Sequence, residues 1–207
     1  MCALIAPHAT SASLAAARIL PILVIGDSYS AGNGAGAYFG AKGCWRSPNN
    51  YAGAFARALE GAPYDQPTVL DNVACSGDTT HAFAHWTHGR RPQLDAVNKG
   101  YDIIFLTVGG VDIDSAGIIQ NCPIQITRDG RKCNALLSAA EKDLSDRTLQ
   151  GRIVDVLNGT RQRANSEARI GLLGYPYIER QEHYLLPYGH GKSIDVPTGQ
   201  ISDAATT

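Results

Sequence analysis

The chain has 207 residues, the size of one ordinary domain, and 44% of them are apolar, which is enough to build a buried core. Its formal net charge of −1 gives no sign of a nucleic-acid footprint or a basic membrane patch. No apolar run approaches the roughly 20 residues that a membrane span requires. Length, composition and charge therefore argue against nucleic-acid-binding and membrane-spanning proteins.

The N-terminal residues 1–17 are mildly apolar and rich in small side chains, but they lack the positive start of a complete signal peptide. One explanation is that Met1 is an internal start and that these residues are the rear of a longer signal. We expect residues 1–18 to be a signal-peptide remnant or a disordered segment, outside the domain formed by residues 19–187.

Apolar runs alternate with amphipathic segments along the rest of the chain. The apolar runs predict strands at residues 19–25, 68–74, 101–108 and 169–174. Helical patterns occupy residues 48–59, with Tyr51, Phe55 and Leu59 as apolar positions, 92–97, and 134–166, where Gly151 and Gly159 are expected to break or bend the helix. This alternation predicts an α/β fold of three layers, α/β/α, around a central parallel sheet.

The tail changes character at Tyr188, because no clear period and no final strand follow it. We expect residues 188–207 to be a loop or truncated tail whose continuation is missing; a natural disordered end is the alternative.

Polar and glycine-bearing segments follow three of the predicted strands, at residues 26–30, 75–80 and 109–112. Active sites of open parallel sheets lie at the carboxyl ends of the strands. We therefore expect these segments, which are far apart in the sequence, to meet at one edge of the sheet.

Four of the five cysteines fall into two pairs, Cys44 with Cys75 and Cys122 with Cys133. Neither pair has the CxxC spacing of a metal or redox site. Two structural disulfides fit best, with Cys2 left over, and they imply an oxidising compartment. Five reduced core thiols are the alternative.

The segments at the strand ends resemble a known family. Residues 25–34 read IGDSYSAGNG, residues 74–80 read ACSGDTT, residues 107–113 read TVGGVDI and residues 171–177 read GLLGYPY. In this order they resemble the blocks of the SGNH (GDSL-like) esterases and lipases, closest to their secreted, disulfide-containing actinobacterial branch. The two cysteine pairs also match places where that branch carries disulfides.

The resemblance implies a flavodoxin-like sheet and a secreted enzyme that hydrolyses carboxylic esters through an acyl-enzyme on Ser28. A serine hydroxyl is a poor nucleophile until a base takes its proton, and a helix beginning beside it would favour the developing oxyanion. The N–H groups of Ser28 and Gly77 are the expected oxyanion donors. No cofactor or metal is implied, and a monomer acting on small esters, lipids or acylated sugars is expected.

This sequence departs from the family at the expected oxyanion hole. Val111 stands where the family has an asparagine, and valine has no side-chain donor. The loss of one donor costs roughly 3 kcal/mol of transition-state stabilisation. The polar residues nearby in sequence that could replace it are Asn33, Asn72 and Asp112, of which the aspartate can donate only when protonated.

The general base is the second departure, because no Asp-x-x-His follows Tyr177. His81 and His190 are the candidates within the chain, and a base beyond residue 207, or no base at all, is the alternative. If helical, His81, His85 and His88 would share one face and could bind a metal; a polar helix or loop is the other interpretation.

The departures leave two rival functions open. The domain could be a catalytically impaired relative that binds a ligand or a cell-surface partner, or it could be an acetyl-sugar esterase module of a larger secreted protein. Tyr38 and Trp45 could line an acyl or sugar pocket, or they could simply pack beside Cys44.

Overall fold

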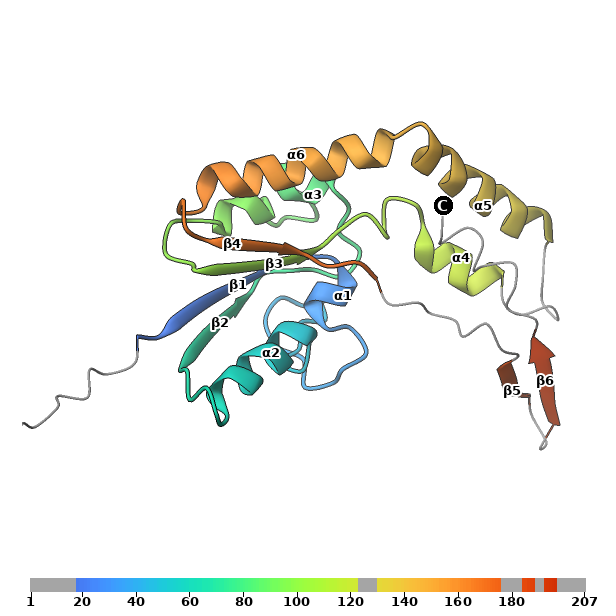
Figure 1. The fold of residues 1–207 in the computed structure, drawn as a ribbon. Coiled ribbons are helices and arrows are strands. Elements are labelled where there is room, and N and C mark those ends of the chain that lie inside the picture. Colours follow the sequence, from blue (N-terminus) through green and yellow to red (C-terminus); the bar gives the residue numbers. More distant parts are fainter. Residues whose placement is uncertain (1–17, 123–129, 176–183, 189–191, 197–207) are drawn as a thin grey trace, which may run out of the picture.

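A computed structural model describes residues 18–122, 130–175, 184–188 and 192–196. Its centre is a parallel sheet of four strands in the order β2-β1-β3-β4, which confirms the predicted α/β fold and the flavodoxin-like order (Figure 1). The strands are β1 (Leu20–Gly26), β2 (Thr68–Asn72), β3 (Ile103–Thr107) and β4 (Arg169–Leu172), each within two residues of a predicted strand. In the register of the sheet, Val24 of β1 lies opposite Asn72 on one side and Phe105 on the other.

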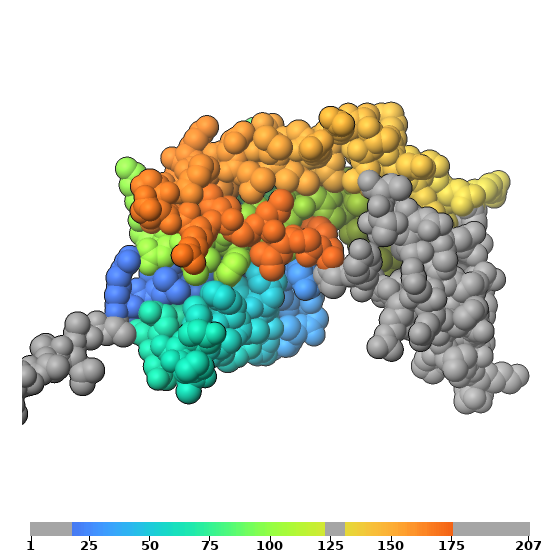
Figure 2. All heavy atoms as spheres, viewed as in Figure 1, coloured from blue at the N-terminus to red at the C-terminus, as the bar shows by residue number. Residues whose placement is uncertain are grey.

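Helices cover both faces of the sheet (Figure 1). On one face lie α6 (Thr148–Arg163), the short 3-10 helix η1 (Gln93–Ala96) and α3 (His81–Ala84); on the other lie α1 (Ser28–Ala31) and α2 (Tyr51–Glu60). The space-filling view shows α6 and β4 on one side of the molecule and the α2 segment on the opposite side (Figure 2).

Adjacent strand residues point to opposite faces, so the two central strands, β1 and β3, each supply side chains to two cores. Leu23 and Ile104 belong to the core that contains Val156 of α6, whereas Val24 belongs to the core that contains Ala52 of α2. Because helices cover both faces, β1 needs the continuous apolar run from which it was predicted.

Helix α2 begins three residues after Pro48, the predicted start. Its N-cap is Asn50, whose side-chain oxygen accepts a hydrogen bond from the Gly53 N–H at 2.8 Å. The helix buries the small residues Ala52, Gly53 and Ala56, while Phe55 stays 37% exposed. The small side chains let the helix approach the sheet closely, and the Phe55 ring meets the Phe105 ring of β3 edge to face with centroids 5.2 Å apart.

The long helical region divides at a different place from the one predicted. Helix α5 (Gly130–Ser145) ends before α6 begins at Thr148, and Gly151 and Gly159 lie inside α6. The break occurs because Arg147 has a left-handed φ of +61° and the Asp146 carboxylate accepts the Thr148 N–H at 2.9 Å. The predicted break at the two glycines is wrong.

Disulfides join Cys44 to Cys75 and Cys122 to Cys133, the pairs expected from the sequence. The second lies in a small separate core between α5 and α4 (Ser115–Asn121), a helix that the sequence analysis did not predict. Cys2 lies outside the described residues, as do residues 1–17.

The predicted loop from residue 188 onward is wrong for residues 192–196. They form β6 (Lys192–Val196), which pairs antiparallel with β5 (Tyr184–Tyr188) and so crosses the expected boundary between residues 187 and 188. A signal was present, because Ser193 to Val196 alternate polar and apolar residues. Within the described ranges, no helix is both long and apolar enough to cross a bilayer.

Candidate active site

The carboxyl end of β1 holds Ser28, the expected nucleophile, at a tight turn. Gly26 has a φ of +135°, and a Cβ there would lie 2.5 Å from both the Ser30 Oγ and the Thr107 carbonyl oxygen, so only glycine fits. Ser28 then begins α1, a helix of a single turn. The Ser28 hydroxyl is half-buried and has no hydrogen-bond partner among the described residues. Its side chain is therefore free to meet a ligand and a base.

The buried side chain of Asp27 holds this turn in place through hydrogen bonds. Its carboxylate is 1% exposed and caps α1 by accepting the Tyr29 N–H at 3.1 Å. The Thr107 hydroxyl donates to the same carboxylate at 2.8 Å, and the Tyr175 hydroxyl donates to its other oxygen. Burial raises the pKa of Asp27, and the bonds from Tyr175 and Thr107 oppose that rise without cancelling it.

A buried cluster of hydroxyl groups also supports this helix. The Ser30 Oγ lies 2.8 Å from the Tyr51 hydroxyl, 2.8 Å from the Thr107 Oγ1 and 2.9 Å from the Thr107 N–H that donates to it. Burial raises the pKa of Tyr51 to about 12, so the phenol stays protonated and remains a hydrogen-bond donor at neutral pH. Because α1 has only one turn, these bonds hold Ser28 in place.

The second expected segment lies beside the first. The Cys75 N–H donates to the Gly26 carbonyl at 2.9 Å, and the Ser76 N–H donates to the Cys44 carbonyl at 3.1 Å. Gly77 has a left-handed φ of +85° with no atom within 4 Å of where a Cβ would stand. Neither the Gly77 N–H nor the Ser28 N–H has an acceptor among the described residues. The two expected oxyanion donors are therefore unoccupied.

A buried ion pair holds the turn that follows Gly77. The Asp78 side chain is 2% exposed and accepts two bonds from the Arg90 guanidinium, at 3.0 and 2.7 Å. The Gln93 amide donates to Asp78 at 2.7 Å and also bonds both the N–H and the carbonyl of Gly26, at 2.7 and 2.9 Å. One side chain thus ties the end of β1 to the Gly77 turn. Neither Arg90 nor Gln93 was predicted from the sequence.

The third segment follows β3 and reaches the first through Tyr175, which follows β4. The Gly110 N–H donates to the Tyr175 hydroxyl at 3.0 Å, and that hydroxyl donates to Asp27. Burial and the nearby Asp27 charge raise the pKa of Tyr175. The expectation that the three segments meet at one edge of the sheet is thereby confirmed.

The candidates for the donor that Val111 lacks differ in what they already bind. Asp112 accepts the Thr80 N–H at 2.9 Å and the Thr80 hydroxyl at 2.5 Å, so it acts as an acceptor. The Asn72 amide donates to the Ala31 carbonyl at 3.2 Å. The Asn33 amide is exposed and donates to the Ser76 Oγ at 3.1 Å, beside the Gly77 turn. Asn33 is the candidate whose amide remains open to solvent.

The described histidines do not form the helical face that the sequence allowed. Helix α3 ends at Ala84, and His88 lies in a turn with a φ of +49°, so the register from His81 is lost. The His81 and His85 rings stack with centroids 4.2 Å apart. Among the described residues, no group of three or more His, Cys, Asp or Glu side chains could hold a metal ion, and none of these histidines bonds Ser28. His190 lies outside the described residues.

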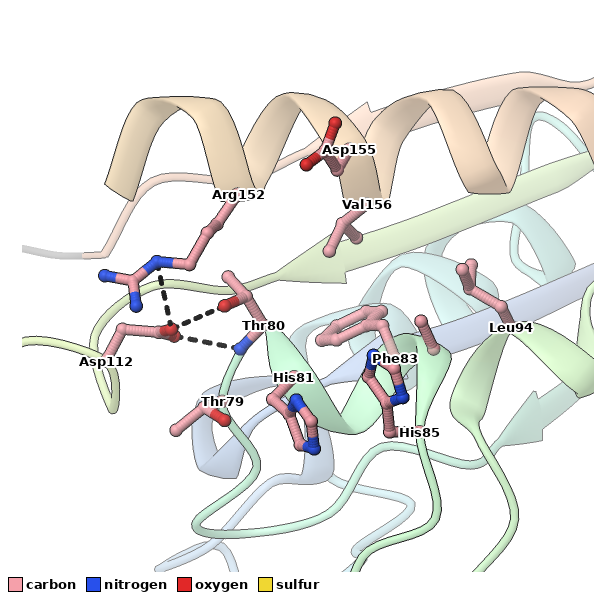
Figure 3. Close-up of a pocket in the computed structure, with 11 residues that line it drawn as sticks. Thr79, Thr80, His81, Phe83, His85, Leu94, Asp112, Arg152, Asp155 and Val156 are labelled. Atoms are coloured by element: carbon pink, nitrogen blue, oxygen red, sulfur yellow. Dashed lines mark hydrogen bonds and ion pairs between the residues drawn. The ribbon is translucent and has the colours of Figure 1, made fainter. Parts of the chain in front are cut away.

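A cavity of about 430 Å³ lies between α3 and α6, and His81 and His85 line it (Figure 3). Asp112 and Arg152 lie at one end of it, with 4.0 Å between the Arg152 Nε and an Asp112 carboxylate oxygen. Neither Ser28 nor Gly77 lines this cavity, so it is separate from the turn that holds the expected nucleophile.

Comparison with known proteins agrees with this geometry. The model of the GDSL-like Lipase/Acylhydrolase family matches residues 24–193. A lipase of Streptomyces rimosus is 32% identical over 169 residues, 80% of this chain and 57% of that protein. Lipase 2 of Streptomyces coelicolor is 32% identical over 83% of this chain and 57% of its own length. The chain thus spans little more than half the length of these relatives.

Two solved structures of Streptomyces enzymes share the fold. Phospholipase A1 from Streptomyces albidoflavus superimposes with a TM-score of 0.66 at 28% identity, covering 91% of this chain and 71% of its own. An extracellular lipase from Streptomyces rimosus superimposes with a TM-score of 0.68 at 26% identity, covering 90% of this chain and 69% of its own.

Proposed function

Because the chain belongs to the GDSL-like lipase/acylhydrolase family, we propose that it hydrolyses carboxylic esters through an acyl-enzyme formed on Ser28. One observation carries the proposal. The Ser28 hydroxyl stands on a rigid turn, and the Ser28 N–H and the Gly77 N–H of the adjoining segment both lack acceptors among the described residues. Unoccupied donors beside a free hydroxyl are what an oxyanion hole requires.

The reaction would proceed in two steps. The Ser28 oxygen attacks the ester carbonyl carbon while a base removes its proton, and the carbonyl oxygen becomes an oxyanion held by the two N–H groups. Collapse expels the alcohol, which takes up the proton, and water then cleaves the acyl-enzyme by the reverse sequence. His81 and His190 remain the proposed bases within the chain, although His81 does not bond Ser28.

The proposed substrates are lipid esters, short-chain esters or acylated sugars, and the proposed location is extracellular. The two disulfides support an oxidising compartment. The names of the relatives support esters of lipids ahead of sugars, because they are lipases and a phospholipase A1. That the protein is a monomer also remains a proposal.

Hydrolysis of 4-nitrophenyl butyrate tests the function directly. Wild type should release 4-nitrophenol with saturation kinetics, and Ser28→Ala should reduce the rate to the uncatalysed background. His81→Asn and His190→Asn separate the two bases, because only the variant that removes the base should lose activity. A Ser28→Ala variant that hydrolyses the ester as fast as wild type would overturn the proposal.

A further inference from the structure

Three large aromatic side chains stand in solvent on one loop between α1 and α2, residues 34–45, called here the aromatic loop. Tyr38 is 44% exposed, Phe39 is 48% exposed and Trp45 is 48% exposed. They do not line the cavity between α3 and α6. Exposed aromatic groups gathered on one segment mark a surface that meets something other than water.

Backbone hydrogen bonds, ring packing and a disulfide hold the aromatic loop in a defined conformation. The Phe39 N–H donates to the Arg46 carbonyl at 2.9 Å, and the Tyr38 and Trp45 rings meet edge to face with centroids 5.1 Å apart. The Cys44–Cys75 disulfide ties the loop to the sheet. Trp45 itself has a φ of +54°, a conformation that is costly for a bulky residue. A fold that sustains this backbone cost to present a tryptophan suggests a function for the ring.

The charged side chains within the segment that carries the loop have one sign. No Asp or Glu occurs from Ser28 to Leu59, although the chain holds 19 of them. Lys42, at the middle of the loop, is exposed. The Arg46 guanidinium is turned inward, donating to the Ala74 carbonyl at 2.7 Å and to the Val73 carbonyl at 2.9 Å. The outer surface of the loop is therefore aromatic and cationic.

We propose that the aromatic loop docks on the lipid–water interface of an anionic bilayer or lipid aggregate. Tryptophan and tyrosine favour the headgroup level, where one end of the ring is apolar and the other is wet. A lysine beside them is attracted to the negative surface potential of anionic lipids, which a nearby carboxylate would have opposed. The aromatic composition, the exposed lysine and the absence of acidic residues from the segment 28–59 all match this one occupant.

The docked loop would bring the candidate active site to the lipid surface. The Ser76 N–H bonds the Cys44 carbonyl at 3.1 Å, so the loop and the Gly77 turn are joined both by backbone and by the Cys44–Cys75 disulfide. The proposal goes beyond ester hydrolysis, and its test needs no turnover.

Co-sedimentation with vesicles tests the proposal. Sucrose-loaded vesicles of phosphatidylcholine with phosphatidylglycerol are compared with vesicles of phosphatidylcholine alone. The double variant Phe39→Ser, Trp45→Asn should lower the partition coefficient by about tenfold or more, because both rings leave the interface. Asparagine is chosen at position 45 because it tolerates positive φ. Lys42→Glu should weaken binding to the anionic vesicles more than to the neutral ones.

The matched control is Trp86→Asn, which removes a tryptophan that is 64% exposed outside the loop and should leave partitioning unchanged. The proposal is overturned if wild type stays in the supernatant with both vesicles, or if Trp86→Asn loses as much binding as the loop variant. It is also overturned if light scattering shows that the loop holds two copies together and vesicles are not bound. Ser28→Ala should bind vesicles like wild type, so loop-dependent binding without ester turnover would refute only the proposed function.

Discussion

Replacing Arg90 with alanine should destabilise the fold far more than the loss of an ordinary surface arginine does. Asp78 is buried, with its side chain 2% exposed, and it lies directly after Gly77. Arg90 supplies two of the bonds to its carboxylate, at 3.0 and 2.7 Å. Without the guanidinium, a buried charge would keep a single side-chain donor, the Gln93 amide at 2.7 Å.

The structure sets the size of the effect. Removing one partner of a buried ion pair costs roughly 3–5 kcal/mol, because the remaining charge is uncompensated. Arg90 is itself 23% exposed and Gln93 remains, so we expect the lower end of that range. With a urea dependence of about 1–3 kcal/mol per molar, a loss of about 3 kcal/mol lowers the midpoint of unfolding by about 1 M or more.

Urea unfolding followed by far-UV circular dichroism at neutral pH measures this shift. Arg91→Ala is the matched control, because the neighbouring arginine is exposed. Arg90→Lys should fall between the two, since it keeps the charge but not the two-pronged geometry. The double variant Asp78→Ala, Arg90→Ala leaves no uncompensated buried charge, so it should recover part of the stability lost in Arg90→Ala. If Arg90→Ala unfolds at the same urea concentration as Arg91→Ala, the pair does not hold this turn and the reasoning fails.

Three further predictions concern the turn and its neighbours. Val111→Asn should raise kcat/KM for 4-nitrophenyl butyrate by at least tenfold, since one oxyanion donor is worth about 10² to 10³ in rate, and an unchanged rate would mean that the missing donor does not limit catalysis. The pKa of Asp27 is higher in the folded protein than its ordinary value of 3.8. At pH values between these two pKa values the folded state binds more protons than the unfolded state, so the free energy of unfolding falls as the pH rises. Tyr175→Phe removes the hydrogen bond that most lowers the pKa of Asp27, so the loss of stability should continue to higher pH in this variant. Melting temperatures of both proteins between about pH 4 and about pH 8 check this, and identical pH dependences would contradict it. The Cys44–Cys75 disulfide joins residues 31 positions apart, and its loss should lower the free energy of unfolding by about 3–4 kcal/mol. A variant with both cysteines changed to serine that unfolds like wild type would show that the disulfide does not stabilise the fold.

The sheet and the segments of the site were predictable because their signals are local. A run such as residues 19–25 is apolar at every position only if both faces are buried, and glycines at Gly26 and Gly77 mark turns that other residues cannot make. The position of Ser28 after a buried strand followed from these local patterns. The roles of Ser28 and of the histidines remain predictions.

The supporting side chains could not be predicted, because their partners are distant in the chain. Gln93 bonds Gly26 across 67 positions, and Tyr175 bonds Asp27 across 148, and no local pattern distinguishes these side chains from ordinary surface residues. The break between α5 and α6 depends on the backbone of Arg147. A Cβ at Gly159 would lie 2.7 Å from a methyl group of Leu94, which would have to shift to admit it. In α6, the glycine serves close packing rather than a break.

The activation of Ser28 is the central claim, and intact-mass analysis after treatment with a fluorophosphonate tests it most directly. The reagent bonds covalently to a serine oxygen only where a base and an oxyanion hole activate it. We predict a single adduct on the 207-residue protein that is absent from Ser28→Ala. Wild type that remains unlabelled, or Ser28→Ala that still takes the adduct, would contradict the account.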